Sequence, residues 1–260
     1  MLDMYQAGPA RLVINRALGA RIHALRLFDV DILVAASEDP IAWGSYPMAP
    51  WAGRIRRGRF RAGDRTLQLP INFPPHAMHG TTYARPWQRD ADGYRIDLGP
   101  DWPFAGFVRQ RFVLSETHLD LRLEVHSESE PFPAAVGWHP WFRRQLATGG
   151  ALQLDFQPTH LLARDWDGIT SAEPVAPGAG PWDDCFTGVV QPVRLHWPGA
   201  LTLEMTASTD VWVVYNQPTH ALCVEPQSAP PNALNDWQQW VHPGEPLILT
   251  SRWSWRSENL

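Results

Sequence analysis

Hydrophobic and polar residues alternate along several stretches of this 260-residue chain. From 119 to 125 every second residue is leucine or valine, and the residues between them are charged. The same period of two runs through 152–156, 201–206 and 247–255. Because successive side chains of a β-strand point to opposite faces, this pattern predicts strands with one face in a core. Shorter apolar runs predict further strands at 11–15, 21–28, 30–35, 94–98, 107–114 and 211–215.

No segment repeats apolar residues at helical spacing over a dozen positions, and 25 prolines and 19 glycines interrupt the chain at turn-like intervals. Many short strands with few helices are typical of a sandwich or a barrel. Strand patterning continues on both sides of the proline- and glycine-rich stretch 173–181, so we interpret this stretch as a surface loop and not as a linker. We therefore expect an all-β protein in which residues 1–260 form a single domain.

Composition narrows the class of partner. The net charge of −5 gives no basic surface for nucleic acid or an anionic membrane, and no apolar run approaches the roughly 20 residues of a spanning helix. The N-terminal residues lack the basic, apolar and cleavage regions of a signal peptide. Two cysteines, Cys185 and Cys223, suggest no disulfide framework. We expect a cytoplasmic monomer or homodimer that acts on a small molecule.

All 22 basic residues are arginines, which excludes two kinds of chemistry. Without lysine the chain forms no Schiff base, so it is neither a pyridoxal phosphate enzyme nor a lysine-dependent aldolase. It also lacks the lysine of a nucleotide-binding P-loop. Neither a G-x-S-x-G motif nor a nucleotide-binding glycine loop is present.

Two side chains are the strongest candidates for acid–base chemistry. Glu225 ends the apolar run Leu222–Val224, and prolines at 226, 230 and 231 follow it. A carboxylate where a strand enters a rigid loop is well placed to act as a base. His139 lies between Trp138 and Trp141, and aromatic faces of this kind pack well against sugar rings. The structural alternatives are a paired buried carboxylate and a core histidine.

Three further segments offer polar side chains. Arg54 follows Pro-Trp-Ala-Gly and is a candidate for two-pronged recognition of hydroxyls, whereas Arg56, Arg57 and Arg59 are expected on a solvated turn. His79, before a glycine, is expected on a tight turn that points into a site. With His76 and His139 it offers an alternative metal site, although the spacing matches no zinc motif. Asp183 and Asp184 are candidates for binding a substrate; the structural alternative is that at least one of them caps backbone N–H groups of a turn.

Taken in order, these segments resemble the aldose 1-epimerase (galactose mutarotase) family. The likeness lies in Pro50-Trp-Ala-Gly-Arg-Ile55, Met78-His-Gly80, Gly137-Trp-His-Pro-Trp-Phe142, Asp183-Asp-Cys-Phe186 and Val224-Glu-Pro-Gln227. The resemblance implies a large two-sheet antiparallel β-sandwich that interconverts sugar anomers with no cofactor and no metal. It also implies that Glu225 is the general base and His139 the general acid. Arg54, His79 and Asp183 are then sugar-binding residues, and we add Trp138 and Trp141 as aromatic platforms.

Two departures from the family pattern leave the substrate open. The usual histidine after the site aspartate is Asp184 here, and the loop after His79-Gly80 is not glycine-rich. One alternative is a hexose 6-phosphate, whose phosphate would need clustered cations. The candidates for that cluster are Arg56, Arg57, Arg85, Arg143 and Arg144. Another alternative is a sugar-binding domain on the same scaffold without turnover.

Overall fold

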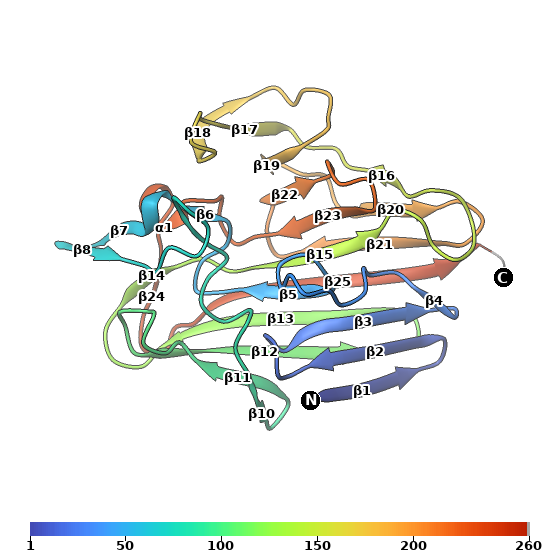
Figure 1. Cartoon of the computed structure of the whole chain (residues 1–260), viewed down its shortest axis with the longest axis horizontal. Helices are drawn as coiled ribbons and strands as arrows, with labels where there is room; N and C mark the ends of the chain where they lie inside the picture. The colour runs from blue at the N-terminus through green and yellow to red at the C-terminus, as the bar shows by residue number, and fades with distance from the viewer. Residues whose placement is uncertain (259–260) are drawn as a thin grey trace.

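A computed structural model describes residues 1–258, and its secondary structure is almost entirely strand. Figure 1 shows two large layers of strands that lie one over the other. Eleven strands form the larger sheet. In spatial order they are β1 (Leu2–Ala7), β2 (Ala10–Asn15), β3 (Arg21–Leu27), β5 (Ser45–Met48), β15 (Gly137–Arg143), β23 (Ala221–Pro226), β22 (Trp212–Tyr215), β19 (Asp183–Thr187), β17 (His160–Arg164) and β18 (Thr170–Val175), with β4 (Val30–Asp31) beside β3.

Eight strands form the second sheet. Their order is β10 (Gln88–Asp90), β11 (Gly93–Asp97), β12 (Gly106–Leu114), β13 (His118–Ser127), β25 (Leu247–Ser257), β21 (Leu201–Ala207), β20 (Val193–Trp197) and β16 (Gln153–Asp155). Three strand pairs lie outside the two sheets: β14 (Phe132–Ala134) with β24 (Gln239–Val241), β6 (Arg54–Ile55) with β9 (Ala77–Met78), and β7 (Arg59–Ala62) with β8 (Arg65–Gln68). The helical elements are η1 (Arg56–Gly58) and α1 (Ala233–Asp236). Within residues 1–258, no helix has the length and apolar character needed to cross a membrane.

The main core joins apolar side chains of both sheets in one cluster. Leu121 and Leu123 of β13 and Trp253 of β25 belong to it, together with Phe142 of β15 and Val224 of β23. These side chains are all nearly or fully buried. Burying apolar area of this kind is the dominant favourable contribution to folding. The all-β, two-sheet antiparallel sandwich expected from the sequence is confirmed.

The strands predicted from alternation are confirmed, whereas the predicted strand at 30–35 is reduced to β4 (Val30–Asp31) and one edge strand was mistaken for a loop. The pattern at 119–125 lies within β13, where it pairs antiparallel with both β12 and β25. The stretch 173–181, however, is not all loop, because residues 173–175 are the end of strand β18. The edge strand β18 pairs only with β17, and its Pro174 lacks an N–H. Proline is tolerated at such an edge, which is why it misled the sequence interpretation.

The β17–β18 hairpin stands apart from the rest of the larger sheet. In Figure 1 it lies at the top of the molecule, above β19 and β22, as the yellow segment. Its turn, residues 165–169, reaches back toward η1 and β6, with Asp165 accepting the N–H groups of Asp167 and Ile169. Arg164 and Thr170 of this hairpin, at the far edge of the sheet, line the cavity described below.

The His79-Gly80 turn runs against the backbone of Ala49. Both residues have positive φ, 61° and 79°, and Ala49 forms a β-bridge with Gly80. A Cβ atom at position 80 would lie 1.9 Å from the Ala49 carbonyl oxygen. Only glycine combines this backbone conformation with so close an approach.

We expect Gly80→Ala to lower the free energy of unfolding by about 2 kcal/mol or more, because it adds a backbone clash to an unfavourable φ. Gly63→Ala is the matched control, since Gly63 also has positive φ (58°) but meets nothing within 4 Å. That variant should lose about 1 kcal/mol. Urea unfolding of both proteins measures the difference, and equal losses would contradict the close approach.

Candidate active site

Strand alternation decides which side chains of β15 reach the site. Trp138 and Phe142 point into the core between the sheets. His139 and Trp141 therefore project from the opposite face, where Trp141 joins a second cluster with Tyr46 and Cys223. On the neighbouring strand β23, Val224 faces the core, which places Cys223 and Glu225 on that same outer face. The candidate site thus lies on the outer face of the larger sheet.

Glu225 and His139 form a direct contact in the middle of this face. The distance between Glu225 Oε1 and His139 Nε2 is 3.2 Å, and both side chains are buried. The other carboxylate oxygen accepts a hydrogen bond from the amide of Gln227 at 3.2 Å. Since His139 Nε2 faces the carboxylate, we place a proton on that nitrogen. The two residues that the resemblance makes base and acid therefore lie side by side.

An aromatic column holds the His139 ring in place. Tyr46, its cross-strand partner on β5, stacks on one side with ring centroids 4.9 Å apart, and Trp141 stacks on the other at 5.3 Å. His79 approaches edge-on at 5.2 Å. Beyond Tyr46 lies Arg21, fully buried, whose guanidinium is 5.1 Å from the Tyr46 ring and donates to three backbone carbonyls. The imidazole plane is thus fixed by packing on both faces.

Burial dominates the proton affinities of the site. It raises the pKa of Glu225 well above the usual carboxyl range, and the negative charge of Asp183 raises it further. Burial lowers the pKa of His139, and the neighbouring His79 and Arg21 act in the same direction. Burial, with help from Arg54, lowers the pKa of His79 to about 3, so His79 is neutral near pH 7. His79 can therefore act as a hydrogen-bonding group without carrying charge.

The polar end of the site is a network of two arginines and two aspartates. Arg164 Nη1 donates to Asp183 Oδ2 at 2.6 Å, and its Nε donates to Asp184 at 3.2 Å. Arg54 approaches the same oxygen of Asp183, with Nη2 at 3.7 Å. All four side chains are about a quarter exposed or less, so part of each faces the cavity. This arrangement offers both donors and acceptors to a hydroxyl-rich ligand.

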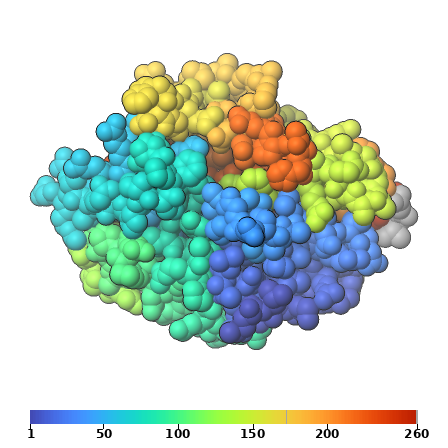
Figure 2. All heavy atoms as spheres, viewed as in Figure 1, coloured from blue at the N-terminus to red at the C-terminus, as the bar shows by residue number. Residues whose placement is uncertain are grey.

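These two groups line one cavity of about 270 Å³, a size that suits a small molecule. Figure 2 shows the surface hollowed between the yellow hairpin, the cyan segment and the orange segment near β22 and β23. Several buried polar atoms on its wall have no hydrogen-bond partner within the described part of the chain. They are His79 Nδ1, His139 Nδ1, Trp141 Nε1 and Gln227 Oε1. Such atoms are rare in folded proteins unless a ligand or water meets them.

The cavity brings together six of the seven site residues proposed from the sequence and excludes one. Glu225, His139, Arg54, His79, Asp183 and Trp141 all line it. Trp138 does not, because the parity of β15 turns it into the core, where its indole N–H donates to Gln110 at 2.8 Å. The assignment of Trp138 to ligand binding is therefore wrong.

One alternative and one further expectation from the sequence are also corrected. His76 does not join His79 and His139, since its Nδ1 accepts the Arg57 N–H and its Nε2 donates to the Asp167 carbonyl. Within residues 1–258, no group of three or more His, Cys, Asp or Glu side chains is arranged to hold a metal ion. Arg56 is not on a simple solvated turn either, because it forms ion pairs with Asp165 and Asp167.

The cavity residues that sequence reasoning missed include Tyr46, Arg164 and Gln227. Gln227 follows Glu225 by two positions, so alternation along the strand end was a usable signal for it. Tyr46 lies within the short strand β5 before Pro47, where no motif distinguished it from other aromatic residues. Arg164 lies on a strand that shares no motif with the rest of the site, and the sequence carried no signal for it.

Comparison with known proteins agrees with this geometry. The family model described as aldose 1-epimerase matches residues 10–252. The chain belongs to the aldose 1-epimerase family. No curated protein sequence matches it.

Solved structures share the fold at low sequence identity. A galactose mutarotase-like protein from Clostridium acetobutylicum has a TM-score of 0.85 at 18% identity, over 98% of this chain and 94% of that one. A Synechocystis protein gives 0.80 at 19% identity, over 99% and 96% of the two chains. Galactose 1-epimerase from Lactobacillus acidophilus NCFM gives 0.78 at 18%, over 98% and 95%. At these identities the likeness establishes the fold.

The two tryptophans of β15 provide a matched test of the site's orientation. We expect Trp138→Phe to lower the free energy of unfolding by about 1–3 kcal/mol, because Gln110 loses its buried partner. Trp141→Phe should cost less, since the Trp141 N–H has no acceptor within the described residues. Denaturant unfolding measures both losses, and a larger loss for Trp141→Phe would contradict the parity of β15.

Proposed function

We propose that the protein interconverts the α and β anomers of a free hexose by acid–base ring opening and closure, without a cofactor. The observation that carries this proposal is the buried contact of 3.2 Å between Glu225 and His139 at the wall of a sugar-sized cavity. In an aldose 1-epimerase family member, this contact supplies an acceptor and a donor of protons side by side.

The reaction needs one proton to move between two oxygens of the sugar. Glu225, as the carboxylate, takes the proton of the anomeric hydroxyl while His139, as the imidazolium beside that carboxylate, gives its Nε2 proton to the ring oxygen, and the bond from C1 to the ring oxygen breaks. The aldehyde turns about the C1–C2 bond, and the two groups then act in reverse on the other face. The sugar stays neutral throughout. On reclosure His139 takes back the proton of the ring oxygen and Glu225 gives its proton to the oxygen on C1, so the pair ends as it began.

The remaining cavity residues hold the sugar. Arg54 and Asp183 present donors and an acceptor to its hydroxyls, and neutral His79 adds a further hydrogen-bonding nitrogen. Trp141 offers part of its ring and an indole N–H to the cavity. Held in this way, the anomeric carbon lies within reach of Glu225 and His139, which is the proximity that catalysis requires.

The charges of the cavity favour a free sugar over a hexose 6-phosphate. Four carboxylates line it, those of Asp39, Asp183, Asp184 and Glu225, against two guanidiniums that already contact aspartates. None of the five arginines considered for a phosphate lines the cavity; these are Arg56, Arg57, Arg85, Arg143 and Arg144. A phosphate dianion would meet net negative charge there.

The buried pair also favours turnover over binding alone. Removing a carboxylate and an imidazole from water has a cost that hydroxyl recognition does not require. A domain that only bound sugar would be served by exposed polar groups and aromatic faces. The pair instead has the raised carboxyl pKa typical of a general base that works near neutral pH.

We expect Glu225→Gln to fold normally and to lose about 10²- to 10⁴-fold in kcat, because it removes the base but keeps the shape. His139→Asn should lower kcat by a similar factor, with a smaller change in KM. Polarimetry of freshly dissolved α-glucose and α-galactose, corrected for the rate in buffer, measures both. Tight sugar binding by the unmodified protein without acceleration would instead identify a sugar-binding domain.

The pH profile gives a second test of the base. Because the pKa of Glu225 is raised, kcat/KM should fall as the pH drops through a value above the ordinary carboxyl range. Asp183→Asn removes the negative charge that contributes to this rise, so the acid limb should move to lower pH even though sugar binding weakens. Asp39→Asn, in the same cavity, should leave the limb in place. If the acid limb of the kcat/KM profile stays at the same pH in Asp183→Asn, Glu225 is not the base.

A further inference from the structure

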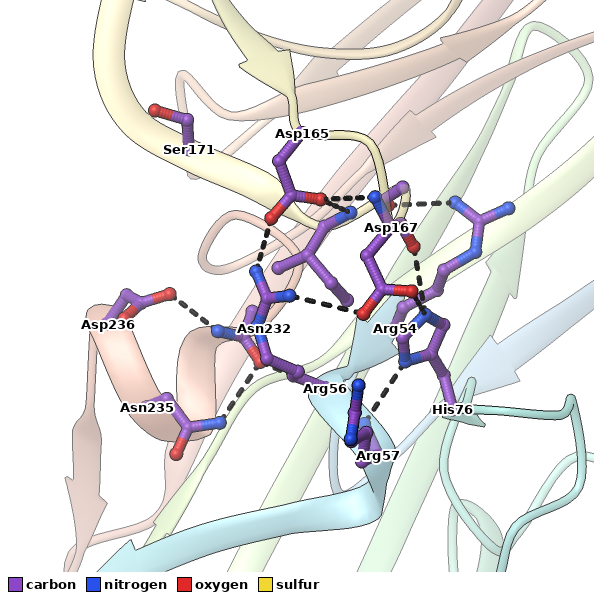
Figure 3. A network of polar contacts seen from close by, with 12 residues as sticks. Arg54, Arg56, Arg57, His76, Asp165, Asp167, Ser171, Asn232, Asn235 and Asp236 are labelled. Atoms are coloured by element: carbon purple, nitrogen blue, oxygen red, sulfur yellow. Dashed lines mark hydrogen bonds and ion pairs between the residues drawn. The ribbon is translucent and has the colours of Figure 1, made fainter.

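A second polar network fastens the turn of the β17–β18 hairpin to the segment that carries Arg54. Figure 3 shows it: Arg56 of η1 lies between the carboxylates of Asp165 and Asp167, and His76 lies beneath the same turn. Arg56 Nη1 is 3.2 Å from Asp167 Oδ2, and Nη2 pairs with Asp165 Oδ2. One guanidinium therefore bridges two carboxylates of one turn, which a planar fork does better than a single ammonium.

His76 makes a second bridge between the same two segments. Its Nδ1 accepts the N–H of Arg57 at 3.1 Å, so its proton lies on Nε2, which donates to the Asp167 carbonyl at 2.9 Å. The ring is 3% exposed, and both of its nitrogens have partners. This neutral, buried bridge complements the partly exposed ionic bridge of Arg56.

The segment Arg54–Arg56, to which the hairpin turn is fastened, is itself held by Asn232. The Asn232 side chain accepts the N–H of Arg56 at 3.0 Å, and the Asn232 N–H donates to the Arg54 carbonyl at 2.8 Å. The side chain also donates to Asp236 at the end of α1. The hairpin turn is thus tied to a supported part of the backbone (Figure 3).

The turn and the strand before it in turn hold two residues of the cavity. The Gly168 carbonyl accepts from Arg54 Nη1 at 3.4 Å, while Arg54 Nη2 faces Asp183. Arg164, the last residue of β17 before the turn, donates hydrogen bonds to Asp183 and Asp184. The position of residues 165–169 therefore decides how Arg54 and Asp183 lie at the cavity.

We propose that Arg56 and His76 are positioning residues for sugar binding, which fix the 165–169 turn and through it the orientation of Arg54 and Asp183. This inference rests on the proposed function for its kinetic readout. Neither residue lines the cavity, and neither is near the Glu225–His139 contact, so both act through other side chains. Their loss should weaken the binding of sugar and leave the proton transfers intact.

The test compares Arg56→Gln with Arg59→Gln, a matched change three residues away on the exposed side of β7. We expect Arg56→Gln to raise KM about 3- to 20-fold, with kcat within about twofold of the unmodified protein. Arg59→Gln should leave both unchanged. Arg56→Lys should fall between them, because an ammonium keeps the charge but loses the two-pronged bridge. Added salt screens the ion pairs of Arg56, so the KM of the unmodified protein should rise with salt concentration. The KM of Arg56→Gln, which lacks these ion pairs, should not change with salt.

Amide hydrogen exchange gives a readout that does not depend on turnover. The amides of Asp167 and Ile169, bonded to Asp165, should exchange faster in Arg56→Gln and in His76→Ala, while peptides from β15 and β23 keep their protection. Loss of protection throughout would mean that the variant is unfolded, and Arg56→Lys then carries the test.

Two results overturn the inference: an unchanged KM in Arg56→Gln, or a fall in kcat at constant KM. Failure of the proposed function is distinct, because it would show as no acceleration by the unmodified protein. In that case faster exchange at 165–169, together with weaker calorimetric binding of hexose in Arg56→Gln, still supports the positioning role, whereas equal binding rejects it.

Discussion

The burial of two titratable groups against each other is the constraint around which this molecule is arranged. Glu225 and His139 lie on adjacent central strands of the larger sheet, β23 and β15, and both are almost fully shielded from water. An isolated charge there would be strongly disfavoured, so each group needs the other and needs fixed neighbours. Tyr46 and Trp141 clamp the imidazole, and Gln227 holds the carboxylate. Central strands can supply that rigidity, whereas a mobile loop cannot.

How much of this could be read from the sequence depended on the range of the interaction. Alternation within single strands predicted the all-β sandwich, since the period of two is a local property. The same rule, applied from His139, places Trp138 and Trp141 on opposite faces, so the error at Trp138 was avoidable. A proline-marked strand end identified Glu225, and the flanking tryptophans identified His139. Their contact across 86 positions depends on the pairing of β15 with β23, which the resemblance to a family implied and the alternation did not.

The polar end of the cavity was out of reach of local reasoning for a physical reason. Arg164 acts through partners 19 and 20 positions away, and Arg56 through a partner 109 positions away. An arginine on a solvated turn and an arginine that bridges two carboxylates have the same sequence environment. Only the fold of the β17–β18 hairpin over η1 separates them. Charge clusters near turns therefore remain ambiguous until the opposite segment is placed.

The two ends of the cavity are positioned by different structural elements. The residues proposed for the chemistry are therefore held independently of those proposed for sugar recognition. Glu225 and His139 are set by the register of central strands, where shifting one residue would turn every side chain to the other face. Arg54, Asp183 and Arg164 are set by an edge hairpin and a short turn held through partly exposed ion pairs. Under the proposed function, changes in the hairpin therefore alter which hydroxyls are recognised without disturbing the proposed proton transfers. Asp184, where the resemblance implies a histidine, lies at this end and pairs with Arg164, so under the proposed function that departure concerns sugar recognition and not the proposed acid–base pair.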